Sequence, residues 1–157
     1  MKYFTIQELT YSDTAKAKGI PNIPNAVQQQ HLVELINSLL DPLRVAWGSP
    51  IKVSSGFRSA ELNKAIGGSN TSAHSLGYAA DLIPSNGKMA EFKAFVMKWL
   101  KGNNIKFDQY INEFKGNTQW VHLGLKNGKG QQRKQYLQFN DGKYRVIYDE
   151  KVRQNKV

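Results

Sequence analysis

Apolar residues with the period of a helix dominate the first third of the chain. Between residues 26 and 47 the apolar positions are Val27, Leu32, Leu35, Ile36, Leu39, Leu40 and Leu43. Such a stripe is typical of an amphipathic helix that packs against a core. We therefore expect one long helix over 26–47. A bend would fall at Asp41-Pro42, because proline lacks the amide proton that a helix interior uses.

Shorter helices are expected on both sides of this long one. Thr5 and Glu8 have the spacing of a capping box, which predicts a short helix at the start of the chain. Two more helices are expected over 60–66 and 89–100, each ended by glycine. The polar stretch 69–75 is expected to be a loop.

Strands are expected mainly in the second half of the chain. The ranges are 51–53, 78–83, 107–113 and 119–125, with one more pair around Asp141-Gly142. The runs 107–113 and 119–125 predict a β-hairpin around Lys115-Gly116-Asn117, with a loop longer than a tight turn. Helices followed by strands indicate an α+β fold, with a small, mainly antiparallel sheet flanked by helices.

Composition and charge limit the classes of function. The chain of 157 residues is 40% hydrophobic, as expected for one globular domain. It has no cysteine, which excludes cysteine nucleophiles, thiolate zinc clusters and disulfides. Its 22 Lys+Arg against 12 Asp+Glu give a net charge of +10. That charge favours an anionic partner (nucleic acid, a membrane surface or an acidic cell-wall polymer), although scattered lysines can also serve solubility alone.

The first residues and the lengths of the apolar stretches bear on localisation. No signal peptide is recognisable near Met1, and no apolar stretch approaches the ~20 residues of a membrane-spanning helix. We therefore expect a protein made in the cytoplasm without stable membrane insertion.

Two of the three histidines lie in settings that suit metal chemistry. His74 ends a polar loop, Asp81 lies on the strand that follows, and His122 lies inside a later strand, whereas His31 is expected to pack on its helix. Two imidazoles and a carboxylate form a ligand set that suits a catalytic zinc with an open fourth position. From spacing alone, an ordinary loop histidine and strand-end aspartate remain the alternative.

The wider sequence adds a family resemblance. The residues that carry it are Ile51-Lys52-Val53-Ser54-Ser55-Gly56-Phe57-Arg58-Ser59, Leu62-Asn63, Ala65-Ile66-Gly67-Gly68, Ser72-Ala73-His74, Gly77, Ala79-Ala80-Asp81 and Trp120-Val121-His122. This pattern resembles the zinc D-Ala-D-Ala carboxypeptidase family, including its phage-type peptidoglycan endopeptidases, whose fold is shared with the hedgehog signalling domain. The resemblance implies a zinc peptidase-like domain over 1–125. The basic extension 126–157 lies outside it and is expected to pack on the same domain.

The resemblance also implies roles for individual residues. His74, Asp81 and His122 match the zinc ligands. Arg58 matches an arginine that faces the substrate, where it could stabilise an oxyanion or bind a peptide carboxylate; a surface ion pair is the alternative. Ser72 would line the site or orient a ligand, if it does not simply stabilise its loop.

The general base is the point at which the sequence departs from the family pattern. Relatives often carry glutamate three residues before the last histidine, where this chain has Gln119, and an amide cannot accept the proton. Glu113, across the expected hairpin from His122, is the best substitute, and Asp108 is the second choice. Glu113 could also be a solvated hairpin carboxylate.

The leading hypothesis is a zinc-dependent peptidase that hydrolyses an amide bond in peptidoglycan stem peptides. Trp120 or Tyr78 could contact the peptide or sugar. The resemblance implies a phage or prophage lysis protein that acts on the cell wall after release or as a virion component. We expect the protein to be a monomer. The alternative is a non-catalytic, zinc-stabilised module that binds the cell wall. Nucleic-acid binding would explain the charge but not the set of His74, Asp81 and His122, so we do not expect it.

Overall fold

Six strands form one sheet in the computed structural model of the chain, which describes residues 1–150. The strand order is β1-β2-β4-β3-β5-β6, and every neighbouring pair is antiparallel except β3 and β5, which are parallel. The strands are β1 (Ile51–Ser55), β2 (Ala79–Pro84), β3 (Gln109–Lys115), β4 (Thr118–Gly124), β5 (Gln135–Asn140) and β6 (Lys143–Tyr148). The predicted α+β fold with a mainly antiparallel sheet is confirmed.

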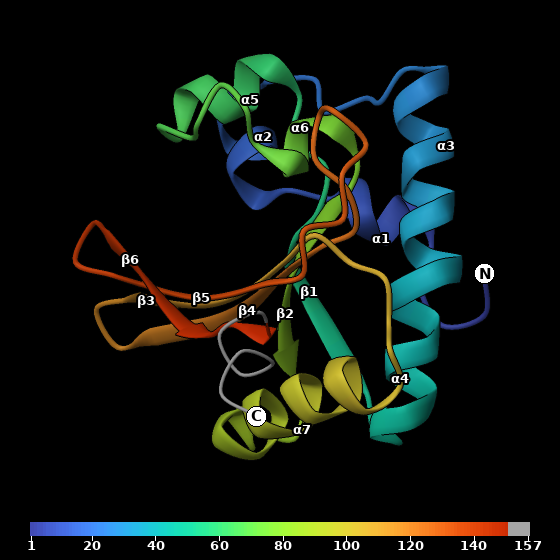
Figure 1. The fold of residues 1–157 in the computed structure, drawn as a ribbon. Coiled ribbons are helices and arrows are strands. Elements are labelled where there is room, and N and C mark those ends of the chain that lie inside the picture. The colour runs from blue at the N-terminus through green and yellow to red at the C-terminus, as the bar shows by residue number, and fades with distance from the viewer. Residues whose placement is uncertain (151–157) are drawn as a thin grey trace.

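The helices flank this sheet (Figure 1). They are α1 (Ile6–Thr10), α2 (Asp13–Lys18), α3 (Ala26–Leu35), the π-helical segment η1 (Ile36–Leu40), α4 (Asp41–Trp47), α5 (Ala60–Ala65), α6 (Ala73–Leu76) and α7 (Met89–Gly102). The segments α3, η1 and α4 follow one another without interruption, as the predicted long helix requires. The amide of Asp41 bonds to the carbonyl of Ile36, five residues back, so the π-helical turn ends just before Pro42. A π-helical turn contains one residue more than an α-helical turn. Here it directly precedes Pro42, which has no amide proton to donate to the regular α-helical hydrogen bond.

The apolar stripe of this long helix covers the sheet together with α7. Its fully buried residues are Leu32, Leu35, Ile36, Leu39, Leu40 and Leu43, and they belong to the same core as Leu82, Phe92, Val96, Val121 and Leu123. Burial of each such side chain stabilises the fold by about 1.5–3 kcal/mol relative to its exposure. Val27, which the sequence placed on the stripe, is 57% exposed.

Two local expectations were wrong, and one helix was not predicted. Helix α2 was not expected, although Ser12 caps its start and Gly19 ends it in the left-handed conformation. The end of the predicted 69–75 loop forms the first turn of α6, capped by Ser72. The β3–β4 turn is not long, since Lys115 pairs with Thr118 and leaves two turn residues. The first is Gly116 with φ 59°, the position where type II′ turns require glycine.

The strands after residue 125 continue the same sheet. β5 pairs with β3, and the predicted strand pair around Asp141-Gly142 is present as β5 and β6. Both turn residues have positive φ, the conformation that favours Asp-Gly in a type I′ turn. Tyr136 on β5 is buried in the common core. The last part of the expected extension 126–157, residues 151–157, lies outside the described residues.

None of the helices in the part of the chain that the structure describes is long and apolar enough to span a bilayer.

Candidate metal centre and active site

Three elements far apart in the chain bring His74, Asp81 and His122 together. Asp81 on β2 and His122 on β4 are direct cross-strand partners, so both side chains point to the same face of the sheet. His74 lies on α6, immediately before β2. Gly77 ends α6 with φ 85°, and a Cβ there would lie 2.7 Å from the carbonyl oxygen of Gln28. The tight turn at Gly77 therefore lets the chain reverse from α6 into β2.

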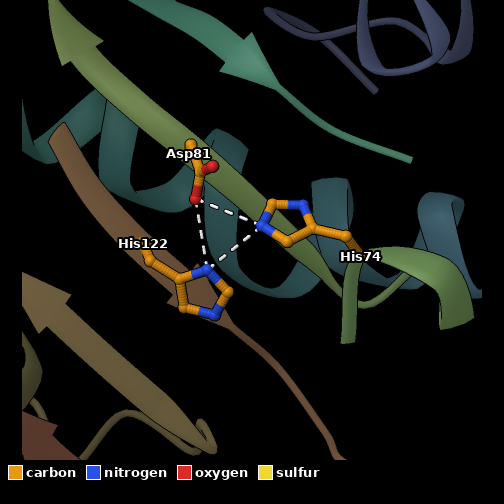
Figure 2. Close-up of side chains that lie close together, drawn as sticks. All are labelled: His74, Asp81 and His122. Atoms are coloured by element: carbon orange, nitrogen blue, oxygen red, sulfur yellow. Dashed lines mark hydrogen bonds and ion pairs between the residues drawn. The ribbon is translucent and has the colours of Figure 1, made fainter. Parts of the chain in front are cut away.

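The three side chains converge on one point (Figure 2). Asp81 Oδ1 lies 3.2 Å from His74 Nε2 and 3.1 Å from His122 Nδ1, and the two imidazole nitrogens are 3.2 Å apart. Ligands about 2.0–2.1 Å from a tetrahedral zinc ion lie about 3.3 Å from one another. The spacing of the three donor atoms therefore fits three corners of such a site. All three residues are buried, and they form the one cluster of this kind among residues 1–150.

A backbone carbonyl fixes the orientation of the His74 ring on the side away from the cluster. Its Nδ1 donates to the carbonyl oxygen of Gly56 at 2.8 Å, which leaves Nε2 as the nitrogen that faces the cluster. Metal-binding histidines commonly have such an outer partner, because it selects the tautomer and the ring orientation. Gly56 itself is held against α1, where a Cβ would lie 2.2 Å from the carbonyl oxygen of Leu9.

The electrostatics of the cluster favour an ionised carboxylate. Burial alone would raise the pKa of Asp81, but His74 and His122 outweigh it and hold that pKa well below its usual range. Burial lowers the pKa of His74 despite the nearby carboxylate. Burial also acts to lower the pKa of His122, but the hydrogen bond and charge of Asp81 leave it above its ordinary value. One carboxylate beside two imidazoles is a donor set that suits zinc.

Glu113 reaches the same centre from β3. Its direct cross-strand partner is Trp120, so Glu113 and His122 are diagonal neighbours rather than the opposed pair that the sequence indicated. The diagonal is still within reach of a long side chain, and Glu113 Oε2 lies 3.8 Å from His122 Nδ1. Trp120 Nε1 donates to the same oxygen at 2.9 Å.

The surroundings of Glu113 adjust its acidity. Burial raises its pKa and the charge of Asp81 adds to the effect, whereas His122, Trp120 and Arg58 oppose it. A carboxyl group with a raised pKa is suited to accept and return a proton near neutral pH. Glu113 is therefore no solvated hairpin carboxylate.

Arg58 and Ser72 lie beside the cluster on its open side. Arg58 Nη2 donates to Ser72 Oγ at a long 3.5 Å, while the buried Nε of Arg58 has no hydrogen-bond partner among the described residues. Ser72 Oγ also accepts from the amide of His74 at 3.2 Å and so caps α6. Arg58 thus has a guanidinium donor to spare for a ligand, and Ser72 helps to set the backbone of His74.

The sequence of this chain matches a protein-family model described as Peptidase M15 over residues 2–124. The chain belongs to the M15 peptidase family. This is the zinc D-Ala-D-Ala carboxypeptidase family, and its members are zinc-dependent peptidases. A search of curated proteins finds no match.

In this M15 peptidase, the side chains of Asp108, the second choice for the base, and of Gln119, which replaces the family's glutamate, are both engaged by basic residues. Asp108 is buried, and its carboxylate accepts from Arg133 Nε and Nη2, each at 2.8 Å, and from the Arg133 amide at 3.0 Å. Gln119 Oε1 accepts from Lys93 Nζ at 2.6 Å. Asp108 lines the same cleft as the cluster, but among residues 1–150 no hydrogen bond or ion pair joins Asp108 or Gln119 to His74, Asp81 or His122.

The cluster of the M15 peptidase lies in a cleft of about 930 Å³. One side is formed by the segment 66–73 after α5, and another by the β3–β4 and β5–β6 hairpins. The cleft is lined by Arg58, Ser72, His74, Asp81, Glu113, Trp120 and His122, and also by Phe139, Asn140, Asp141 and Tyr144. This last group could not be predicted from the sequence, because nothing local to β5 shows that it pairs with β3.

His31 and Tyr78 do not line this cleft, although Tyr78 was a candidate for substrate contact. His31 stacks on Tyr78 with ring centroids 4.0 Å apart and donates from Nδ1 to the carbonyl of Leu76. The Tyr78 hydroxyl donates to Glu34 Oε2 at 3.3 Å. Both residues support α6 and the strand that follows it rather than line the site.

Proposed function

We propose that this zinc-dependent peptidase hydrolyses an amide bond in the stem peptides of bacterial peptidoglycan. The observation that carries the proposal is the position of Glu113, whose carboxylate reaches the His74–Asp81–His122 cluster inside an open cleft. A metal-binding module without turnover has no need of a buried carboxylate with a raised pKa at that point.

Glu113 is the residue that moves protons. Its Oε2 faces the cluster, where it accepts a proton from the attacking water and delivers it to the nitrogen of the leaving amine. Trp120 holds the carboxylate in place through its indole N–H. Gln119 has no part in this step, since its side chain is bonded to Lys93.

Arg58 stabilises negative charge. With Nε unpartnered and Nη2 weakly engaged, its guanidinium donates to the carbonyl oxygen as charge develops there, or to a carboxylate of the substrate. The guanidinium is half-buried beside Asp81 and Glu113, so its hydrogen bonds are less screened than those of an exposed arginine.

His74, Asp81 and His122 are the residues that would hold the metal. A bound zinc ion supplies a Lewis acid that polarises the scissile carbonyl and makes water nucleophilic near neutral pH. The spacing of the three donor atoms and the Gly56 carbonyl behind His74 support this assignment.

The substrate and setting are supported by charge and by resemblance. The net charge of +10 favours association with an anionic polymer such as the cell wall. The sequence pattern resembles phage-type endopeptidases, and we propose the same setting: a phage or prophage lysis enzyme that reaches the wall after release or as part of the virion.

The test is digestion of purified peptidoglycan followed by mass spectrometry of the released products. We expect wild-type protein to release stem-peptide fragments, a chelator to stop the release and added zinc to restore it. Glu113→Gln should lower the rate by about 10²–10⁴-fold while metal content stays unchanged. Glu91→Gln, an exposed glutamate on α7, is the matched control and should keep full activity.

Two other results would contradict parts of this proposal. Wild-type protein that binds zinc and the cell wall without hydrolysis would identify a binding module instead of an enzyme. Hydrolysis undiminished in Glu113→Gln would remove Glu113 from the base role.

A further inference from the structure

An aromatic row runs across the sheet from the candidate base to the rim of the cleft. Glu113 pairs with Trp120 on β4 and with Phe139 on β5, and Phe139 pairs with Tyr144 on β6. Directly paired residues on neighbouring strands point to the same face. The four side chains therefore form one continuous row on the face that carries the metal-ligand cluster.

The outer end of this row is an exposed aromatic pair. The rings of Phe139 and Tyr144 are 4.6 Å apart between centroids and inclined at 44°. Tyr144 is nevertheless 62% exposed, and both residues line the cleft. A large aromatic side chain left open at the rim of a site, and supported from below by a second ring, is well placed to contact a ligand.

This part of the cleft lies beyond the family match. The match ends at residue 124, whereas Phe139 and Tyr144 belong to the hairpin formed by β5 and β6. Figure 1 shows this hairpin beside the β3–β4 hairpin, on the side of the sheet away from α3 and α4. The hairpin therefore adds its own wall to a site whose metal ligands and base lie within the matched range.

We propose that the β5–β6 hairpin supplies a sugar-binding subsite, in which a glycan ring of the substrate stacks on Tyr144 and Phe139. This inference rests on the proposed peptidoglycan substrate. The C–H face of a pyranose ring is apolar and flat, so it packs on an aromatic ring, and its hydroxyl and acetamido groups need polar partners. Asn140 and Asp141, in the turn beside the pair, line the same cleft and supply such groups.

The chemistry of the substrate favours sugar over peptide at this position. Stem-peptide side chains are mostly small or charged and offer little surface to a pair of aromatic rings. Two strand spacings separate Glu113 from Tyr144, which is about 10 Å. An extended peptide covers that distance in about three residues. The subsite would therefore favour cleavage of a bond within about three residues of the sugar.

The test compares a disaccharide-linked stem peptide with the same stem peptide without sugar. The ratio of interest is kcat/KM for the disaccharide-linked peptide divided by kcat/KM for the sugar-free peptide. We expect Tyr144→Ala and Phe139→Ala to lower this ratio about five- to tenfold, through a higher KM for the disaccharide-linked peptide. Tyr144→Phe keeps the ring and should keep the ratio. Val146→Ala is the matched control, because Val146 lies two residues along β6 on the same face and is 63% exposed, yet does not line the cleft.

A binding measurement separates this inference from the proposed function. An N-acetylglucosamine tetramer is titrated into the full-length protein and followed by NMR, with Tyr144→Ala as the comparison. Saturable binding that weakens in Tyr144→Ala supports the subsite even if the wild-type protein cleaves neither substrate, a result that would overturn only the proposed function. The subsite is overturned if the wild-type protein does not bind the tetramer and the variants leave the kcat/KM ratio unchanged. An equal loss of kcat/KM on both substrates would show that the two rings bind peptide instead of sugar.

Discussion

Asp81 on β2 and His122 on β4 face each other directly across two paired strands, with Asp81 Oδ1 3.1 Å from His122 Nδ1. Because side chains alternate between the faces of a sheet, a slip of one residue would move one of them to the opposite face. The register that builds the sheet is thus the register that brings the candidate metal ligands together. Metal binding and folding stability should be coupled.

The first prediction follows from this coupling. Zinc that binds only the folded cluster stabilises it by about 4 kcal/mol at a thousand times its dissociation constant. Thermal unfolding should therefore occur at a lower temperature in chelator than in zinc. Asp81→Asn should abolish the difference, while Asp13→Asn, an exposed aspartate on α2, should retain it. A zinc-dependent shift that survives in Asp81→Asn would exclude Asp81 as a ligand.

The second prediction concerns Trp120. Its indole N–H donates to Glu113 Oε2 and so favours the ionised carboxylate, which lowers the Glu113 pKa. Trp120→Phe removes this donor, so the pKa of Glu113 should rise. Because a base is active above its pKa, the acidic limb of the kcat/KM profile should move to higher pH. Phe95→Leu, a partly buried aromatic of α7 outside the cleft, is the control and should leave the profile in place.

The sequence was most informative where the signal was local or belonged to the family pattern. The spacing of Leu32, Leu35 and Leu39 predicts the helix, and the structure buries all three. His74, Asp81 and His122 were selected by donor chemistry and resemblance, and the structure brings them together. Glu113 could be selected because a hairpin restricts which residues can converge with His122.

The sequence was least informative where the structure depends on pairing between distant segments. The parallel pairing of β5 with β3 joins residues 26 positions apart, and no local period reveals it. Phe139 and Tyr144 reach the cleft only through that pairing. The hairpin is centred between Gly116 and Asn117, about one residue earlier than expected, which makes Trp120 rather than His122 the direct partner of Glu113. A hydrophobic pattern cannot resolve so small a difference.

The third prediction tests the support behind His74. Gly56 packs so closely against α1 that a Cβ would lie 2.2 Å from the carbonyl oxygen of Leu9, and its own carbonyl orients the His74 ring. Gly56→Ala should lower the free energy of unfolding by about 1–3 kcal/mol and weaken zinc binding about 10–100-fold. Gly102→Ala, at the end of α7 with open space around it, should be neutral or slightly stabilising. Denaturant unfolding and zinc titration of both variants provide the measurement.

The last prediction separates the two carboxylates considered as the base. Asp108 is bound by three donors of Arg133, and its side chain is 3% exposed against 39% for Arg133. Asp108→Asn replaces the carboxylate with a neutral amide and should lower the free energy of unfolding by about 2–3 kcal/mol. The loss is smaller than for a fully buried ion pair, because Arg133 is partly solvated.

The kcat of folded Asp108→Asn should stay near the wild-type value, because its carboxylate is engaged with Arg133 and does not touch the cluster. Glu113→Gln should show the reverse pattern, with stability retained and turnover lost. Urea unfolding and steady-state kinetics on the same preparations measure both quantities. A large fall in kcat for Asp108→Asn with unfolding unchanged would move the base role from Glu113 to Asp108, since only a group that acts in the chemistry lowers turnover without weakening the fold.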